Sequence, residues 1–143
     1  MSPLLKIREI YFCPTKNNIA AGIMIGDVAV TPALKPIDSC TNSVITGEVA
    51  DQVRATLENL YFSLEAAGMG RGTIAQARFF MQRLTERVAI DPLWEERYPN
   101  PQNRPSYKSV PANLPEGMHV MLQVIAVRDA RRRGLEVVAL LPE

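Results

Sequence analysis

Residues 47–72, GEVADQVRATLENLYFSLEAAGMGRG, decide the fold of this chain. Their apolar side chains recur at spacings of four, three and four residues, which places one apolar stripe on a helix: Val53, Leu57, Leu60 and Leu64. Charged and amide residues lie between and beside them, and we expect these to form a solvated back: Asp51, Gln52, Arg54, Glu58, Asn59 and Glu65. Acidic residues near the start and Gly68 near the end match the usual helix termini. The stretch predicts a two-sided helix that lies against a sheet.

The composition is that of one soluble globular domain. The 143 residues suffice for a single core, and 47% of them are hydrophobic and 22% charged. A formal net charge of +1 offers no electrostatic basis for binding nucleic acid or an anionic membrane. No apolar run approaches the roughly 20 residues of a membrane span. Two isolated cysteines, Cys13 and Cys40, suit a reducing compartment, so we expect a cytoplasmic protein.

The other segments predict strands on both sides of that helix and a second helix. Strand patterns occupy residues 5–12, 20–26, 27–31, 73–83, 106–110 and 118–128. Alternation in residues 73–83 places one set of side chains on the same face: Ile74, Gln76, Arg78, Phe80 and Gln82. Residues 85–98 predict a helix capped by Thr85, or one that begins afresh with Asp91 as the cap and Pro92 as its first residue. Residues 32–46 predict a long loop. This order is typical of an α+β layer, with helices on one face of a mixed sheet.

Three blocks of sequence, in this order and spacing, resemble the Rid family of reactive intermediate deaminases, also called the YjgF family. They are GDVAVT at 26–31, GEVADQVRATLENLYFSLEAAG at 47–68, and RPSYKSVPANLPEGMHVMLQVIAV at 104–127. The resemblance implies a chorismate mutase-like fold with a six-stranded mixed sheet backed by two helices. It also implies a homotrimer with ligand clefts between subunits. We expect residues 1–130 to form the single domain and 131–143 a C-terminal extension.

The resemblance also implies where a ligand binds, and there the sequence departs from the family pattern. The family arginine that holds a substrate carboxylate aligns with Ser106, and the family glutamate of the last strand aligns with Met121. The family tyrosine aligns with Ile19, and its Ser-Gly pair with Pro32 and Ala33. All four positions have changed, which predicts a divergent member without the usual deaminase residues.

Several other residues are candidates for chemistry. His119, the only histidine, is a candidate general acid or base, or else a surface residue. Arg78 within an apolar strand binds a ligand, or forms a structural ion pair, or faces a solvated interior at the trimer axis. The segment with Arg104, Tyr107 and Lys108 supplies anion and hydroxyl contacts, or a polar subunit interface. We take His119, Tyr107 and Ser106 as candidate catalytic residues, and the candidate substrate-binding residues are Arg104, Arg78, Gln123, Met121 and Ala33.

Two functions from different classes fit these observations. The first is a divergent Rid-family enzyme acting on an imine, an enamine or a related anionic metabolite in an inter-subunit cleft, with residues 32–40 as a lid. The second is a non-catalytic ligand-binding or regulatory trimer. In both cases we expect a small-molecule ligand and no nucleic-acid or membrane partner. No pattern of metal ligands or cofactor-binding residues is present in the sequence, so no metal or cofactor is expected.

Overall fold

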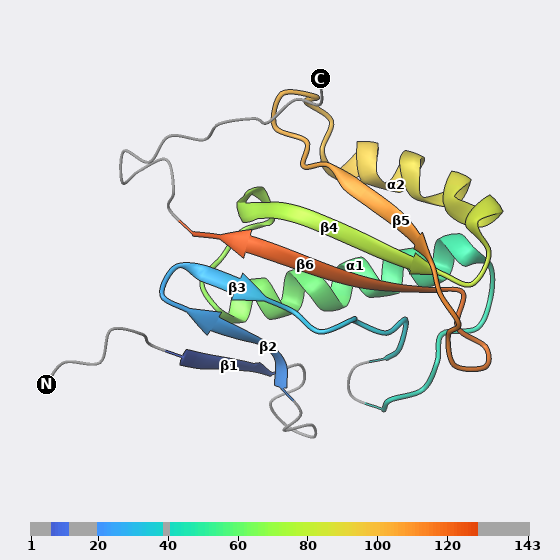
Figure 1. The fold of residues 1–143 in the computed structure, drawn as a ribbon, viewed down its shortest axis with the longest axis horizontal. Helices are drawn as coiled ribbons and strands as arrows, with labels where there is room; N and C mark the ends of the chain where they lie inside the picture. The colour runs from blue at the N-terminus through green and yellow to red at the C-terminus, as the bar shows by residue number, and fades with distance from the viewer. Residues whose placement is uncertain (1–6, 12–19, 39–40, 129–143) are drawn as a thin grey trace, which may run out of the picture.

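One six-stranded sheet carries two helices on a single face in the computed structural model, which describes residues 7–11, 20–38 and 41–128 (Figure 1). The elements in chain order are β1 Ile7–Tyr11, β2 Ala20–Ile25, β3 Val28–Val30, α1 Val49–Ala66, β4 Ile74–Met81, α2 Ile90–Arg97, β5 Tyr107–Pro111 and β6 Val120–Val127. Residues 131–143, the expected extension, lie outside the described part of the chain.

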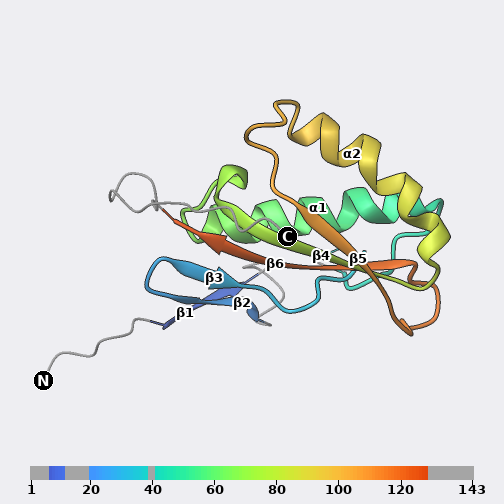
Figure 2. The same cartoon turned by 45° about the horizontal axis from the view of Figure 1, so that its top comes forward.

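The strand order in the sheet is β1-β2-β3-β6-β4-β5, so the last strand of the chain occupies a central place. β4 and β5 are parallel, and the other neighbouring pairs are antiparallel. Turning the molecule shows α1 and α2 together above the sheet, whose lower face they leave open (Figure 2). The predicted α+β layer with a mixed sheet and two helices is confirmed.

The stripe of α1 forms the centre of the core. Its four predicted apolar residues all have an exposed fraction of 0%: Val53, Leu57, Leu60 and Leu64. The backbone N–H of Glu48 donates a hydrogen bond to the Asp51 carboxylate at 2.9 Å, which satisfies a donor at the helix start. Gly68 follows the helix with φ of 75°, a conformation that other residues adopt at a cost. The predicted helix and its buried face are therefore confirmed.

Two amides of α1 contradict the expected solvated back. Gln52 is 2% exposed and Asn59 is 7% exposed. The Asn59 side chain donates hydrogen bonds to the carbonyls of Lys35 and Ile37 at 3.2 and 2.9 Å. Both amides are buried because they bind backbone groups of loops that cross the helix, which the spacing of apolar residues does not reveal.

A bulge changes the predicted face pattern of β4. The pairing of β4 with β6 shifts between Ile74 and Gln76, so Ile74 is buried on the same side as Ala77. Ile74 is therefore not on the face of Arg78, as simple alternation predicts. From Gln76 to Met81 the alternation is regular, and Arg78 lies on the open face of the sheet.

The second helix begins later than Thr85. Residues Leu84–Ala89 form 3₁₀ turns, and α2 starts at Ile90 with Ala89 as its N-cap residue. Pro92 is thus the third helical residue instead of the first, and Asp91 is inside the helix instead of capping it. A proline is tolerated there because the N–H groups of the first turn have no intrahelical partner. Thr85 as the cap and Asp91 as the alternative cap are both wrong.

The loop of residues 32–46 is attached to the body of the domain at its beginning. The backbones of Leu34 and Leu122 exchange two hydrogen bonds, at 2.6 and 3.0 Å, which extends the pairing of β3 with β6 beyond Val30. Leu34 itself is 1% exposed. The start of the proposed lid is therefore held on the sheet, and the Asn59 contacts hold it on α1.

Candidate functional site

The open face of the sheet holds most of the predicted substrate-binding residues. Along β6 the buried residues alternate with half-buried ones that face away from the helices, and the latter include Met121, Gln123 and Ile125. Arg78 lies directly beside Gln123 in the register of β4 with β6. On the far side, the Gln123 side chain donates a hydrogen bond to the carbonyl of Thr31 at 3.2 Å. Ala33 follows on that chain, between the two places where it pairs with β6.

His119 lies at the end of this face, just before β6, and its surroundings suit proton transfer. Its ring Nδ1 is 3.3 Å from Oε1 of Glu86, a residue of the 3₁₀ turns. Its backbone is fixed on both sides, since its N–H donates to Gln52 at 2.7 Å and its carbonyl accepts from the N–H of Gln82 at 3.1 Å. A carboxylate at this distance can accept a hydrogen bond from Nδ1 and so orient the ring.

Gln52 is a residue that the sequence reasoning missed. Besides accepting from His119, its side-chain nitrogen donates to the carbonyls of Ile45 and Gly117 at 3.0 and 2.8 Å. One buried amide thereby joins α1 to the loop that contains Ile45 and to the loop that contains Gly117 and His119. Its signal in the sequence was an uncharged polar residue next to the apolar stripe, which indicates burial only weakly.

Tyr107 is on the other side of the sheet from Met121 and Gln123. Its ring packs edge-on against Phe79 and Trp94, with ring centroids 5.5 and 5.6 Å away. Its hydroxyl donates a hydrogen bond to the Asp91 carboxylate. Burial, and then the bond to Asp91, raise the pKa of Tyr107 above its ordinary value. The hydroxyl therefore remains protonated at neutral pH, and within one chain it does not reach the open face.

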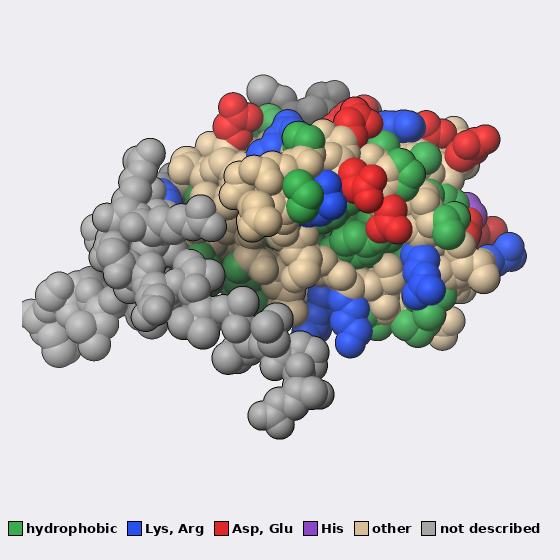
Figure 3. Space-filling model, turned by 90° about the horizontal axis from the view of Figure 1, so that it is seen from above, with side chains coloured by type: hydrophobic (Ala, Val, Ile, Leu, Met, Phe, Trp, Pro, Cys, Tyr) green, Lys and Arg blue, Asp and Glu red, His purple; other side chains and the backbone are tan. Residues whose placement is uncertain are grey.

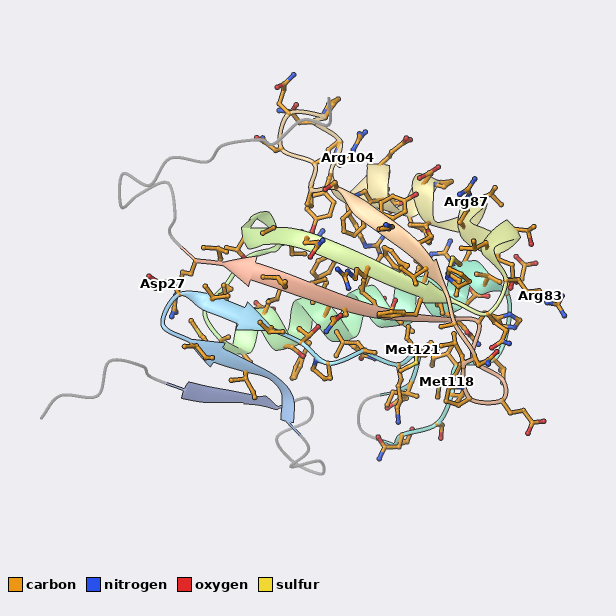
Figure 4. All side chains as sticks on the ribbon, in the orientation of Figure 1. Asp27, Arg83, Arg87, Arg104, Met118 and Met121 are labelled. Atoms are coloured by element: carbon orange, nitrogen blue, oxygen red, sulfur yellow. The ribbon has the colours of Figure 1, made fainter. Side chains whose placement is uncertain are left out.

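Arg104 and Ser106 lie at the opposite end of the sheet from Met121. Figure 4 shows Arg104 at the beginning of β5 and Met121 near the beginning of β6, at the other end of the strands. The guanidinium of Arg104 donates to the carbonyls of Tyr98 and Pro99 at 2.8 and 3.4 Å, where α2 ends. Ser106 is exposed and directly precedes β5. Because β4 separates β5 from β6, one chain alone does not bring these residues to Met121.

Charges are distributed unevenly over the face seen from above (Figure 3). In the view from above, acidic side chains gather over the upper part and the middle, and the lower rim shows lysine and arginine without acidic neighbours (Figure 3).

Among the described residues, no group of three histidine, cysteine, aspartate or glutamate side chains is close enough to hold a metal ion. Within the same ranges, no helix combines the length and hydropathy of a membrane span.

A family model and several known proteins match the sequence of this chain. A family model described as Endoribonuclease L-PSP matches residues 15–128. A 2-iminobutanoate/2-iminopropanoate deaminase of Salmonella typhimurium is 28% identical over 109 residues, which cover 75% of this chain and 84% of the relative. The RutC family protein PH0854 of Pyrococcus horikoshii is 24% identical over 95 residues, covering 66% of this chain and 74% of that protein.

Solved structures show the same fold at lower identity. The YjgF gene product of Escherichia coli superposes with a TM-score of 0.68 at 23% identity, covering 84% of this chain and 94% of that one. TdcF of Escherichia coli, in a crystal structure with bound serine, gives 0.70 at 22% identity, with 89% and 99% covered. The family model spans most of the chain and the relatives agree with it, so this protein belongs to the Endoribonuclease L-PSP family, also called the Rid or YjgF family.

Proposed function

We propose that this protein is a trimeric Rid-family enzyme that acts on a small imine, enamine or related anionic metabolite in a cleft between subunits. The observation that carries the proposal is the separation within one chain of Ser106 from Met121: Ser106 precedes β5, Met121 lies near the start of β6, and these two strands run in opposite directions on either side of β4. These are the positions that resemblance to the family places in a single ligand site, and a second copy is needed to bring them together. The deaminase activity in the name of the Salmonella relative supports the class of reaction.

The open face supports assembly with further copies. Four aliphatic side chains of β2 and β3 are well exposed there: Ile23 at 47%, Ile25 and Val30 at 39%, and Val28 at 38%. A contiguous apolar patch of this kind is typical of a surface covered by another chain. A homotrimer that packs its sheets inward covers these residues and places β5 of one subunit opposite β6 of the next. A cytoplasmic location for this assembly is part of the proposal.

His119 is the proposed general base. In the hydrolysis of an imine, a water oxygen attacks the carbon of the C=N bond while His119 takes the water proton. The imidazolium returns that proton to the nitrogen, which gives a carbinolamine. The carbinolamine hydroxyl then gives its proton to His119, which passes it to the amino nitrogen, and the C–N bond breaks to release ammonia and a carbonyl compound. Glu86, 3.3 Å from the ring, stabilises the imidazolium that forms. Ser106, just before β5, is the proposed hydroxyl group of the cleft. Tyr107, bound to Asp91 on the helical side, orients β5, and Arg104 fixes the turn before it.

The test is ammonia release from 2-iminobutanoate generated in the assay by a threonine dehydratase. We expect the protein to accelerate hydrolysis over the spontaneous reaction, and we expect His119→Gln to lower kcat by a factor of about 10²–10⁴. Arg54→Gln, which removes an exposed charge from α1, is the matched control and retains the rate. Parent protein that gives no acceleration with several such imines contradicts the proposed activity.

The second candidate is a non-catalytic ligand-binding or regulatory trimer. The changed positions favour it, because Ser106 and Met121 replace the family arginine and glutamate on which the usual deaminase chemistry depends. The two candidates differ in one measurement: a protein that binds the product 2-oxobutanoate without accelerating imine hydrolysis is the regulator.

A further inference from the structure

Three polar side chains form one row across the open face. In the parallel register of β4 with β5, Arg78 is the partner of Lys108, and in the antiparallel register of β4 with β6 it is the partner of Gln123. Neighbouring strands are about 4.8 Å apart, so the three side chains emerge side by side. We call Lys108, Arg78 and Gln123 the cationic row.

The two cations of this row have no counter-charge among the described side chains. Arg78 and Lys108 are exposed, and among the described residues neither makes an ion pair or a side-chain hydrogen bond. The outward-facing positions of β2 to β6 contain no aspartate or glutamate. The like charges therefore repel each other next to a neutral amide, and no acidic side chain of β2 to β6 compensates them on this face.

An apolar row lies next to the cationic row. One step further along the same face, Phe80 of β4 is the partner of Val110 on one side and of Met121 on the other. All three side chains are half-buried. The open face thus presents positive charge beside a strip of apolar surface of similar width. A ligand that satisfies both rows has an anionic head and a short apolar part.

We propose that the cationic row binds the carboxylate of a small amphipathic acid, whose apolar part packs on Phe80 and Met121. This rests on the proposed function, because it places the substrate in the same cleft. A planar guanidinium and an adjacent ammonium together offer more donors to a carboxylate than a single arginine does. If a second copy covers this face, the two cations lose water, and a bound anion offsets that desolvation. The row also explains how a chain with Ser106 in place of the family arginine holds a carboxylate.

Binding of butyrate and of its neutral isostere butyramide tests this inference by isothermal titration at fixed ionic strength. We expect the parent to bind butyrate, and butyramide at least about tenfold more weakly, because a charge-assisted contact is worth about that factor. Arg78→Gln and Lys108→Gln should each weaken butyrate by about tenfold without affecting butyramide. Arg78→Lys retains the charge without the planar fork and should bind butyrate more tightly than Arg78→Gln does. Arg54→Gln on the helical layer should change nothing.

Light scattering on each variant separates loss of binding from loss of assembly. The cationic row is refuted if variants that remain assembled bind butyrate as tightly as the parent. It is also refuted if the parent binds butyramide as tightly as butyrate, or binds neither compound. The proposed function is tested separately by hydrolysis of 2-iminobutanoate. If the parent accelerates hydrolysis and Arg78→Gln binds butyrate as tightly as the parent, the cationic row is refuted and the proposed enzyme activity stands. If the parent does not accelerate hydrolysis but its butyrate binding depends on Arg78 and Lys108, the proposed enzyme activity is refuted and the cationic row stands.

Discussion

Oε1 of Gln52 accepts a hydrogen bond at 2.7 Å from the backbone N–H of His119, a residue 67 positions later in the chain. The same amide donates to carbonyls of Ile45 and Gly117, so it binds three backbone groups while almost fully buried. An amide saturated in this way holds two loops in fixed positions relative to α1. It thereby fixes the backbone of the one histidine in the chain.

Replacing Gln52 by alanine should therefore destabilise the protein by roughly 1–3 kcal/mol, because it leaves buried backbone groups without partners. Glu58→Ala, at an exposed position of the same helix, is the matched control, and we expect a change within about 0.5 kcal/mol. Urea denaturation measures both. Hydrogen exchange should also accelerate at residues 112–119 in Gln52→Ala; unchanged exchange there would show that the amide does not hold this loop.

The apolar stripe of α1 supports a second prediction. Leu57 and Leu64 are 0% exposed against the sheet, so Leu57→Ala and Leu64→Ala should each cost about 2–5 kcal/mol. Both variants should retain the denaturant m-value of the parent, since the folded state stays compact. Near-neutral effects at both positions in urea denaturation would mean that the stripe is not the core that the structure describes.

The long elements could be predicted from sequence, because their periodicity reflects burial directly. The stripe of α1 and the alternation of β6 both arise from a single buried face, so their patterns are regular. The predictions of strand face and helix start were wrong where an irregularity interrupts the regular spacing of buried residues. These irregularities are the bulge after Ile74 and the 3₁₀ turns before Ile90. Neither leaves a distinctive residue in the sequence, since Thr85, Asp91 and Pro92 match a helix start equally well.

The candidate site was less predictable, because its parts come from pairings between distant segments. Lys108, Arg78 and Gln123 are neighbours only because of the registers of three strands. The register between β4 and β6 depends on where the bulge lies. Gln52 differs from a solvated amide only through partners 7, 65 and 67 residues away. Resemblance to a family indicates the region of the candidate site, and the strand registers decide which side chains are neighbours in it.

Alkaline titration provides a third prediction. Burial, the largest cause in each case, raises the pKa values of Tyr61, Tyr98 and Tyr107 above the ordinary value of about 10. A raised pKa means that the folded state binds the phenolic proton more tightly than the unfolded state does. The contribution of these groups to stability is therefore fully present below pH of about 10 and is lost as the pH rises above it.

Absorbance at 295 nm should accordingly show these phenols ionising later than free tyrosine and together with unfolding. Tyr98→Phe removes one of them, together with its hydrogen bonds to Tyr61 and to the Arg71 carbonyl. The variant should lose stability at pH 7 but depend less on pH in the alkaline range. If all the tyrosines of the parent titrate normally while the protein remains folded, these side chains are more accessible than the structure shows.

The last prediction concerns the open face as a subunit interface. Ile23 on that face is 47% exposed, and Phe62 on the outer side of α1 is 45% exposed, so the two large apolar residues are matched in accessibility. Only Ile23 belongs to a contiguous apolar patch, with Ile25, Val28 and Val30 around it.

If the sheets of a trimer pack inward, a carboxylate at position 23 is buried without a partner, at a cost of several kcal/mol in each subunit. We therefore expect Ile23→Glu to reduce the trimer to monomers in multi-angle light scattering at micromolar concentration. Phe62→Glu places the same charge on the helical layer and should remain a trimer. A parent that is itself monomeric at that concentration would refute the inter-subunit cleft, because Ser106 and Met121 would then have no second chain to bring them together. A trimer that tolerates Ile23→Glu but not Phe62→Glu would instead place the interface on the helices and leave the cationic row facing solvent.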